Sequence, residues 1–307
     1  MSESNSKYEF LEAITNGMAD AVEAASAFTV LVNARKRLPV SGVLIKPDIV
    51  VSVDHGIETD DRIQVILPGG GTSQASLLGR DAGSDLAVLR LESPYGELKS
   101  GPLSRVARVG QPVIAVGKPE PEGVQASFGI VTTIGGGLRT MKGAVLEQYV
   151  ATDATPYPGF SGGPLLAITG QVLGLNTSGL VGGLSLAIPF QLVLEVANQL
   201  EQHGRVKRGF LGIRSQQVEL PQNLVLETGL DQKTGLLLVG VEQGGPAAAG
   251  GLMMGDILVA IDNQTIQDQD DLFVRLSGEV VGKNVSLKIV RGGKITTVSV
   301  LVGERTR

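Results

Sequence analysis

Residues 158–164 read Pro-Gly-Phe-Ser-Gly-Gly-Pro and place Ser161 between glycines, in a predicted tight turn. Backbone amides in such a turn can come close to a reacting carbonyl group. A serine hydroxyl is a weak nucleophile until a base removes its proton, and the oxyanion that then forms needs fixed hydrogen-bond donors. The amides of Gly159 and Ser161 are the expected donors. The same pattern also occurs in ordinary turns, so the rest of the sequence has to supply a base.

The sequence contains 2 histidines, and they differ in their surroundings. His203 lies at the predicted end of a helix, where an imidazole is most simply explained as a partner of the helix dipole. His55 directly follows the apolar run 49–53, where a strand meets a loop, a common place for functional groups. Asp85 comes immediately before the apolar run 86–91 and could accept the second imidazole N–H of His55. We therefore take His55 as the candidate base and Asp85 as its partner.

Short runs rich in β-branched residues, separated by glycine, proline and aspartate clusters, predict a mainly β structure between residues 28 and 175. The predicted strands are 28–32, 43–45, 49–53, 63–67, 86–91, 113–116, 126–131, 146–151 and 172–175. Strands that are this short and this evenly spaced favour β-barrels or a sandwich.

The domain organisation follows from the length of 307 residues and from a change of pattern near residue 204. Residues 27–203 form the predicted first domain, which ends in a helix over 189–202. The basic segment 204–208 is the predicted linker. Residues 209–307 form a smaller second domain. Its predicted elements are strands near 210–214, 235–241, 256–261, 284–290 and 295–301, with a helix near 268–277.

Within the N-terminal segment 1–26, residues 6–26 predict an amphipathic helix rather than a strand. Ser6 and Glu9 form a capping-box pattern, and apolar residues recur every three or four positions after it. Those residues are Leu11, Ile14, Met18, Val22 and Ala25. The helix could pack against its own domain or form a subunit contact. A helix lying on a membrane surface is disfavoured because the polar face is acidic.

Composition narrows the function classes. Hydrophobic residues make up 42% of the chain and charged residues 19%, which excludes a disordered chain, and a net charge of −5 disfavours nucleic-acid partners. With no cysteine and 2 histidines we expect no metal site, and no cofactor is expected because the glycine-rich loops match neither nucleotide-binding motif. No apolar run is long enough to span a membrane and no export signal is visible, so a cytoplasmic location is the direct expectation.

The order of His55, Asp85 and Ser161 in a β-rich domain resembles the trypsin-like serine proteases, and the details resemble their HtrA/Deg branch. The resembling segments of the first domain are 41–43, 51–55, 84–88, 151–154, 159–164, 174–177 and 186–189. In the second domain, segments 209–213, 244–248 and 255–258 are similar to a PDZ domain. The resemblance implies two six-stranded β-barrels of the trypsin-like fold, followed by an α+β PDZ domain.

The resemblance also implies roles for individual residues. Ser161 would be the nucleophile, His55 the general base and acid, and Asp85 its orienting partner, with the amides of Gly159 and Ser161 as the oxyanion hole. The residues implied to line the first specificity pocket are Thr155, Asn176 and Ser185, and those implied to pair with the substrate backbone are Asn176, Thr177 and Ser178. The loop implied to bind a peptide carboxylate in the PDZ domain consists of Phe210, Leu211, Gly212 and Ile213, helped by Arg208.

The implied function is an ATP-independent serine endopeptidase that hydrolyses exposed segments of misfolded or unfolded proteins, with a PDZ domain that binds peptide C-termini. The alternative is an inactive binding, chaperone or adaptor protein that uses the PDZ groove and the cleft. Members of this family are usually periplasmic or organellar, and usually homotrimers joined by aromatic N-terminal segments; the candidates here are Tyr8, Phe10 and Phe28. Phe160 replaces the usual asparagine, and a ring there would narrow the site or cover the oxyanion hole.

Overall fold

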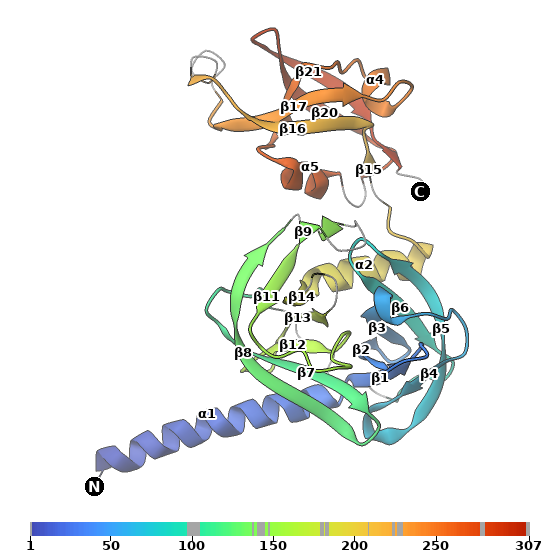
Figure 1. Cartoon of the computed structure of the whole chain (residues 1–307), viewed down its shortest axis with the longest axis vertical. Coiled ribbons are helices and arrows are strands. Elements are labelled where there is room, and N and C mark those ends of the chain that lie inside the picture. The colour runs from blue at the N-terminus through green and yellow to red at the C-terminus, as the bar shows by residue number, and fades with distance from the viewer. Residues whose placement is uncertain are drawn as a thin grey trace. The chain divides into compact units, whose positions relative to one another are not determined.

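The computed structural model describes residues 2–96, 105–136, 138–139, 145–146, 148–178, 181, 184–207, 209–222, 225, 230–276 and 280–304. The chain forms two compact units, Met1–Val206 and Lys207–Arg307. The division falls inside the segment 204–208 that we predicted to be a linker. Figure 1 shows the elements of both units, and each unit is described by itself.

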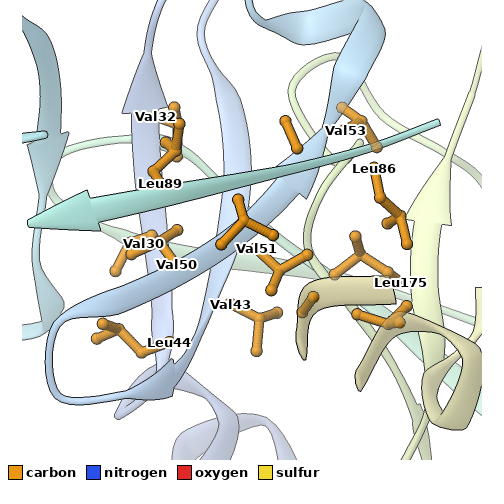
Figure 2. Close-up of a cluster of buried hydrophobic side chains, with 14 of the residues drawn as sticks. Val30, Val32, Val43, Leu44, Val50, Val51, Val53, Leu86, Leu89 and Leu175 are labelled. Carbon is orange, nitrogen blue, oxygen red and sulfur yellow. The ribbon is translucent and has the colours of Figure 1, made fainter. Parts of the chain in front are cut away.

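The first unit begins with a closed six-stranded barrel whose strand order is β1-β2-β3-β6-β5-β4. Its strands are β1 (Thr29–Asn33), β2 (Val40–Lys46), β3 (Ile49–Val53), β4 (Ile63–Ile66), β5 (Thr72–Asp81) and β6 (Leu86–Leu91). The core is mostly aliphatic, and Figure 2 shows valine and leucine side chains from several of these strands meeting inside it. All five residues of β3 are buried, so this strand is a rigid base for the turn that follows it.

A second closed six-stranded barrel has the order β11-β14-β13-β12-β7-β8. Its strands are β7 (Pro112–Glu120), β8 (Gly123–Gly135), β11 (Tyr149–Thr152), β12 (Pro164–Ala167), β13 (Val172–Thr177) and β14 (Ser185–Pro189). The short strands β9 (Leu138–Arg139) and β10 (Val145–Leu146) pair with each other beside it. Two closed barrels confirm the trypsin-like fold class expected for the first domain.

Three barrel strands were not among the nine predicted from the sequence, and each has a physical reason. β5 is largely polar, and its exposed and buried residues alternate along much of its length. β12 is a four-residue strand that begins with proline and has no β-branched residue. β14 is short and runs directly into a helix. In addition, the strand predicted over 146–151 is divided between β10 and β11.

Two long helices accompany the barrels, α1 (Ser2–Ser26) and α2 (Phe190–His203). The helix predicted over 189–202 extends one residue further, to His203. Gly204 ends it, with φ 69° and its N–H donated to the Leu200 carbonyl at 2.8 Å. His203 lies in the last turn of α2, outside the candidate site.

The structure corrects two details at the N-terminus. Helix α1 begins at Ser2, so Ser6 lies inside it and does not cap it. Ala21, Ala25 and Phe28 are buried in the core of the first unit, so Phe28 is not available for a subunit contact. Tyr8 is 70% exposed, and the side chain of Phe10 lies outside the described residues. The N-terminal part of α1 extends away from the barrels in Figure 1.

The second unit is built on an antiparallel sheet with the main order β16-β17-β18-β20-β21. Its elements are β15 (Gly209–Phe210), β16 (Ile213–Glu219), β17 (Thr234–Val241), α4 (Pro246–Ala249), β18 (Ile257–Ile261), β19 (Gln264–Thr265), α5 (Gln269–Arg275), β20 (Asn284–Arg291), β21 (Lys294–Leu301) and β22 (Gly303–Glu304). A separate aliphatic core holds this unit together. Across the described part of the chain, no helix is long and apolar enough to cross a membrane.

Candidate active site and peptide-binding loop

His55 lies in the 3-10 turn η1 (Asp54–Gly56), directly after β3. The ladder between β3 and β6 pairs Val53 with Leu86, which brings the residue before β6, Asp85, next to this turn. His55 Nδ1 lies 2.8 Å from Asp85 Oδ2, and the His55 amide donates to Asp85 Oδ1 at 3.0 Å. The first barrel therefore supplies an imidazole and a carboxylate that are already paired.

The Asp85 carboxylate is buried, with 2% of the residue exposed, and a third residue completes its hydrogen bonding. Thr177, the last residue of β13 in the second barrel, donates its hydroxyl to Asp85 Oδ2 at 2.6 Å. A buried carboxylate is tolerated only when such donors satisfy it. The resemblance implied that Thr177 pairs with substrate; the structure places its side chain on Asp85, a contact that no local sequence signal indicates.

Ser161 lies in the turn that precedes β12, and the first barrel holds this turn through Ser41 of β2. The Ser41 amide donates to the Ser161 carbonyl at 2.8 Å, and its hydroxyl donates to the Gly159 carbonyl at 2.7 Å. Gly162 has φ 88°, and a Cβ atom there would lie 2.0 Å from the Ser41 carbonyl oxygen. Ser41 is thus a contact between the two barrels, and glycine is required where the turn passes it.

The two backbone amides expected to form the oxyanion hole have no hydrogen-bond partner among the described residues. Within the described residues, the amides of Gly159 and Ser161 make no hydrogen bond, although their neighbour Phe160 donates its amide to the Tyr157 carbonyl at 3.0 Å. Gly159 has φ 87°, and the contact with Ser41 fixes its carbonyl. Two backbone N–H groups next to the serine hydroxyl thus remain free to bind an anionic oxygen.

Phe160 does not lie over these amides, which corrects the expectation that its ring would narrow or cover the site. The residue is completely buried in the core of the second barrel, and its ring packs edge-on against Tyr157 with 5.5 Å between centroids. Gly117 makes room for it, since a Cβ atom at residue 117 would lie 2.6 Å from the Phe160 ring. A large apolar side chain gains more from this burial than from exposure beside the nucleophile.

The hydroxyl of Ser161 is bonded to Ser178 rather than to His55. Ser161 Oγ lies 2.8 Å from Ser178 Oγ and accepts the Ser178 amide at 3.1 Å. No hydrogen bond joins Ser161 to His55, both of which belong to the described part of the chain. The structure therefore brings together His55 and Asp85, and separately Ser161 and Ser178.

The residues expected to line the specificity pocket differ in their contacts. Asn176 is 4% exposed, and its side-chain amide donates to the Pro164 carbonyl at 2.9 Å. Its backbone groups are paired with Gly162 and Gly163, so Asn176 braces the second barrel and does not present its groups to a pocket, contrary to the expectation. Thr155 is exposed, and Ser185 is half-buried in β14.

A buried lysine lies close to the nucleophile turn. Lys118 is 4% exposed, its backbone amide donates to Ser41 Oγ at 2.7 Å, and its Nζ donates to the Leu67 carbonyl at 2.9 Å. Burial lowers the pKa of Lys118 from its usual value. Its amide is one of the contacts that orient the Ser41 hydroxyl. Within the described residues, no cluster of three or more histidine or carboxylate side chains could hold a metal ion.

In the second unit, the loop of Phe210, Leu211, Gly212 and Ile213 joins β15 to β16. The amides of Leu211 and Gly212 make no hydrogen bond within the described residues, and Gly212 has φ 75°. β16 is an edge strand, and Gln269 of α5 donates to the Ser215 carbonyl of β16 at 2.7 Å. An edge strand beside free loop amides is the arrangement that accepts an extended peptide with a terminal carboxylate. Arg208 lies outside the described residues.

Comparisons with known proteins agree with both units. A model of the trypsin-like peptidase domain matches residues 40–175, and a model of the PDZ domain matches residues 209–302. A protein of Halomonas elongata, named "Probable periplasmic serine endoprotease DegP-like", is 36% identical over 271 residues, which are 86% of this chain and 56% of the relative. A protein of Pseudomonas savastanoi pv. phaseolicola with the same name is 35% identical over 272 residues, 86% of this chain and 55% of the relative.

Solved structures that resemble this chain include HtrA-type proteases and a serine endoprotease. The HtrA-type protease AlgW with a tripeptide has a TM-score of 0.80 and 29% identity, covering 94% of this chain and 98% of that one. The serine endoprotease from Yersinia pestis has a TM-score of 0.73 and 26% identity, covering 94% and 98%. The fold and the site thus define a trypsin-like serine protease scaffold. The chain belongs to the HtrA/Deg family, with a PDZ domain after the protease domain.

This chain spans about half the length of the curated relatives it matches, 56% of the first and 55% of the second. Those relatives are named periplasmic, and nothing in the comparisons supports the cytoplasmic location expected from the N-terminal sequence.

Proposed function

We propose that the chain is a serine endopeptidase in which Ser161 is the nucleophile, His55 the general base and acid, and Asp85 the orienting carboxylate. The observation that carries this proposal is the buried bond of 2.8 Å between His55 Nδ1 and Asp85 Oδ2. Such a bond leaves Nε2 as the unprotonated nitrogen that can accept a proton.

In the proposed mechanism, Ser161 Oγ attacks the peptide carbonyl carbon while its proton passes to His55 Nε2. The negative charge that develops on the carbonyl oxygen is stabilised by the amides of Gly159 and Ser161. His55 then gives the proton to the leaving amine, and a water molecule repeats the attack on the acyl-enzyme. Asp85 stabilises the imidazolium throughout, supported by Thr177 at 2.6 Å.

The proposed substrates are exposed segments of misfolded or unfolded proteins, hydrolysed without ATP. Thr155 and Ser185 carry no charge, and an unpaired ammonium or guanidinium is costly to bury, so we expect cleavage after small or medium aliphatic residues rather than after lysine or arginine. The PDZ domain would bind peptide or protein C-termini through the amides of Leu211 and Gly212. By analogy with the relatives that are named periplasmic, we place the protein in the periplasm. The family resemblance implies a homotrimer, for which Tyr8 and Phe10 are candidate subunit contacts.

A fluorophosphonate probe tests the proposal, because it reacts covalently only with an activated serine. We expect the wild-type chain to be labelled and to degrade denatured casein, and the Ser161→Ala variant to do neither while unfolding like the wild type. Ser93→Ala, which changes an exposed serine in the same unit, is a control for serine removal. Absence of labelling in the folded wild type would favour the inactive binding protein instead.

A further inference from the structure

The contact between Ser161 and Ser178 has no part in the mechanism above, and it occupies the atom on which that mechanism depends. A serine hydroxyl has one proton and two acceptor lone pairs. Ser161 Oγ accepts the Ser178 amide at 3.1 Å and shares a second hydrogen bond with the Ser178 hydroxyl at 2.8 Å. Ser161 is 5% exposed, so water cannot easily replace these bonds.

Both possible directions of the hydroxyl–hydroxyl bond weaken the nucleophile. If Ser161 donates, its proton points to Ser178 and not to His55. If Ser178 donates, both lone pairs of Ser161 Oγ are occupied and none is free to attack a carbonyl carbon. Each direction is consistent with the lack of a hydrogen bond between Ser161 and His55, two residues that the structure describes.

The backbone at residue 178 explains how the contact can be released. The ladder between β13 and β14 has its last pair at Thr177 and Leu186, so Ser178 lies just beyond the sheet. Its amide donates to Ser161 Oγ and not to a strand carbonyl. The carbonyl group of an extended peptide competes chemically for such an amide, since extended backbones pair through these donors.

We propose that Ser178 is a positioning residue that holds the Ser161 hydroxyl in a resting position, and that an extended peptide pairing at the end of β13 releases it toward His55. This inference rests on the proposed function of Ser161. It gives the active site a preference for extended polypeptide over small esters and amides, because a small molecule cannot take the Ser178 amide.

The test is the Ser178→Ala variant of the full chain, which removes the hydroxyl and keeps the amide. We expect a small fluorophosphonate to label this variant about three to ten times faster than the wild type, the effect of losing one hydrogen bond. Hydrolysis of denatured casein should change less than twofold, because the peptide already displaces the contact. Ser178→Thr keeps a hydroxyl and should label at the wild-type rate. Ser73→Ala removes a buried serine hydroxyl from β5 and is the matched control.

The outcomes separate this inference from the proposed function. Labelling of Ser178→Ala that is equal to or slower than wild type, in a protein that unfolds normally, overturns the resting contact. If Ser178→Ala raises the rate of casein hydrolysis by the same factor as the rate of probe labelling, the proposed release of Ser161 by an extended peptide is wrong. If wild type and all Ser178 variants label no more than Ser161→Ala, the proposed function fails and this inference fails with it. Ser178→Gly is the second hydroxyl-free variant if Ser178→Ala does not fold.

Discussion

The two barrels contribute unequal halves to the candidate active site. In the first barrel, His55 and Asp85 lie 2.8 Å apart, and the buried carboxylate is satisfied by further donors from His55 and Thr177. In the second barrel, Ser161 is held by Ser178, and the amides of Gly159 and Ser161 make no hydrogen bond with any described residue. The half from the first barrel is already hydrogen-bonded before substrate binds, whereas the half from the second barrel keeps the amides of Gly159 and Ser161 unpaired among the described residues.

The difference follows from what each half must do. The imidazole and its carboxylate need a fixed orientation, and a buried, fully bonded pair provides it. The oxyanion donors must stay unpaired in the free protein, because their partner forms only during the reaction. Substitutions in each half, and one outside both, are expected to reduce activity by decreasing amounts.

Asp85→Asn should give the largest loss, because it acts on the half that is already complete. An amide cannot hold the imidazole in the same tautomer, and in triads of this kind the substitution lowers kcat by about 10⁴-fold. Casein hydrolysis measured with purified protein checks this. Asp61→Asn, which changes an exposed aspartate in the same barrel, should keep wild-type activity. Near-normal activity of Asp85→Asn would show that His55 does not depend on this carboxylate.

Gly162→Ala should disrupt the Ser161 turn, which is the second barrel's half of the site. The new Cβ would lie 2.0 Å from the Ser41 carbonyl oxygen, at a residue with φ 88°. We expect a loss of about 3 kcal/mol or more in the free energy of unfolding, together with loss of probe labelling. Urea unfolding is the measurement. Gly71→Ala is the matched control, because a Cβ at that glycine meets no atom within 4 Å and its φ is −64°.

Thr177→Val tests how much the second barrel supports the first. The hydroxyl that donates to Asp85 Oδ2 at 2.6 Å is replaced by a methyl group of similar size. A hydrogen bond to a charged group contributes about 1.5 kcal/mol or more, so kcat/KM should fall about tenfold while KM changes little. Steady-state kinetics on a peptide substrate would reveal this. Thr169→Val, in the exposed turn between β12 and β13, should have no effect.

The smallest effect on activity is expected at Asp256 of the second unit, which lies outside both halves of the site and acts on acid stability. Burial alone would raise the pKa of Asp256, but hydrogen bonds from Arg291 and the Met253 amide, with the Arg291 charge, lower that pKa overall. The stabilisation is therefore present above the unfolded pKa of about 3.9 and is lost as the pH falls toward the lower pKa of the folded protein. Asp256→Asn should cost about 2 kcal/mol at pH 7.

Calorimetric unfolding of the full chain between pH 3 and 7 can detect this loss. The transition of the second unit should depend less on pH in Asp256→Asn than in the wild type. Asp231→Asn changes an exposed aspartate of the same unit and should keep the wild-type dependence. An equal pH dependence in all three proteins contradicts the assignment to Asp256.

Much of the fold was predictable because it depends on local patterns. Runs such as Ile49–Val53 and Leu86–Leu91 are mostly apolar, and they form strands with the predicted bounds. The strand β5 was missed because its alternating polar residues look like a loop in a single sequence. The N-terminal helix was predicted from residue 6, four residues after its actual start at Ser2, because Ser6 and Glu9 match a capping-box pattern.

The chemical groups of the site and their order along the chain follow from the sequence: one histidine after a strand, one aspartate before a strand, and one serine in a glycine turn. Their hydrogen-bond partners depend on the tertiary structure. Ser41, Thr177 and Ser178 are far from at least one of the residues they contact, and only the closing of two barrels brings a hydroxyl of β13 to Asp85 and an amide of β2 to Ser161. The Phe160 ring likewise lies in the core, because burying it in the space left by Gly117 is more favourable than exposing it beside Ser161.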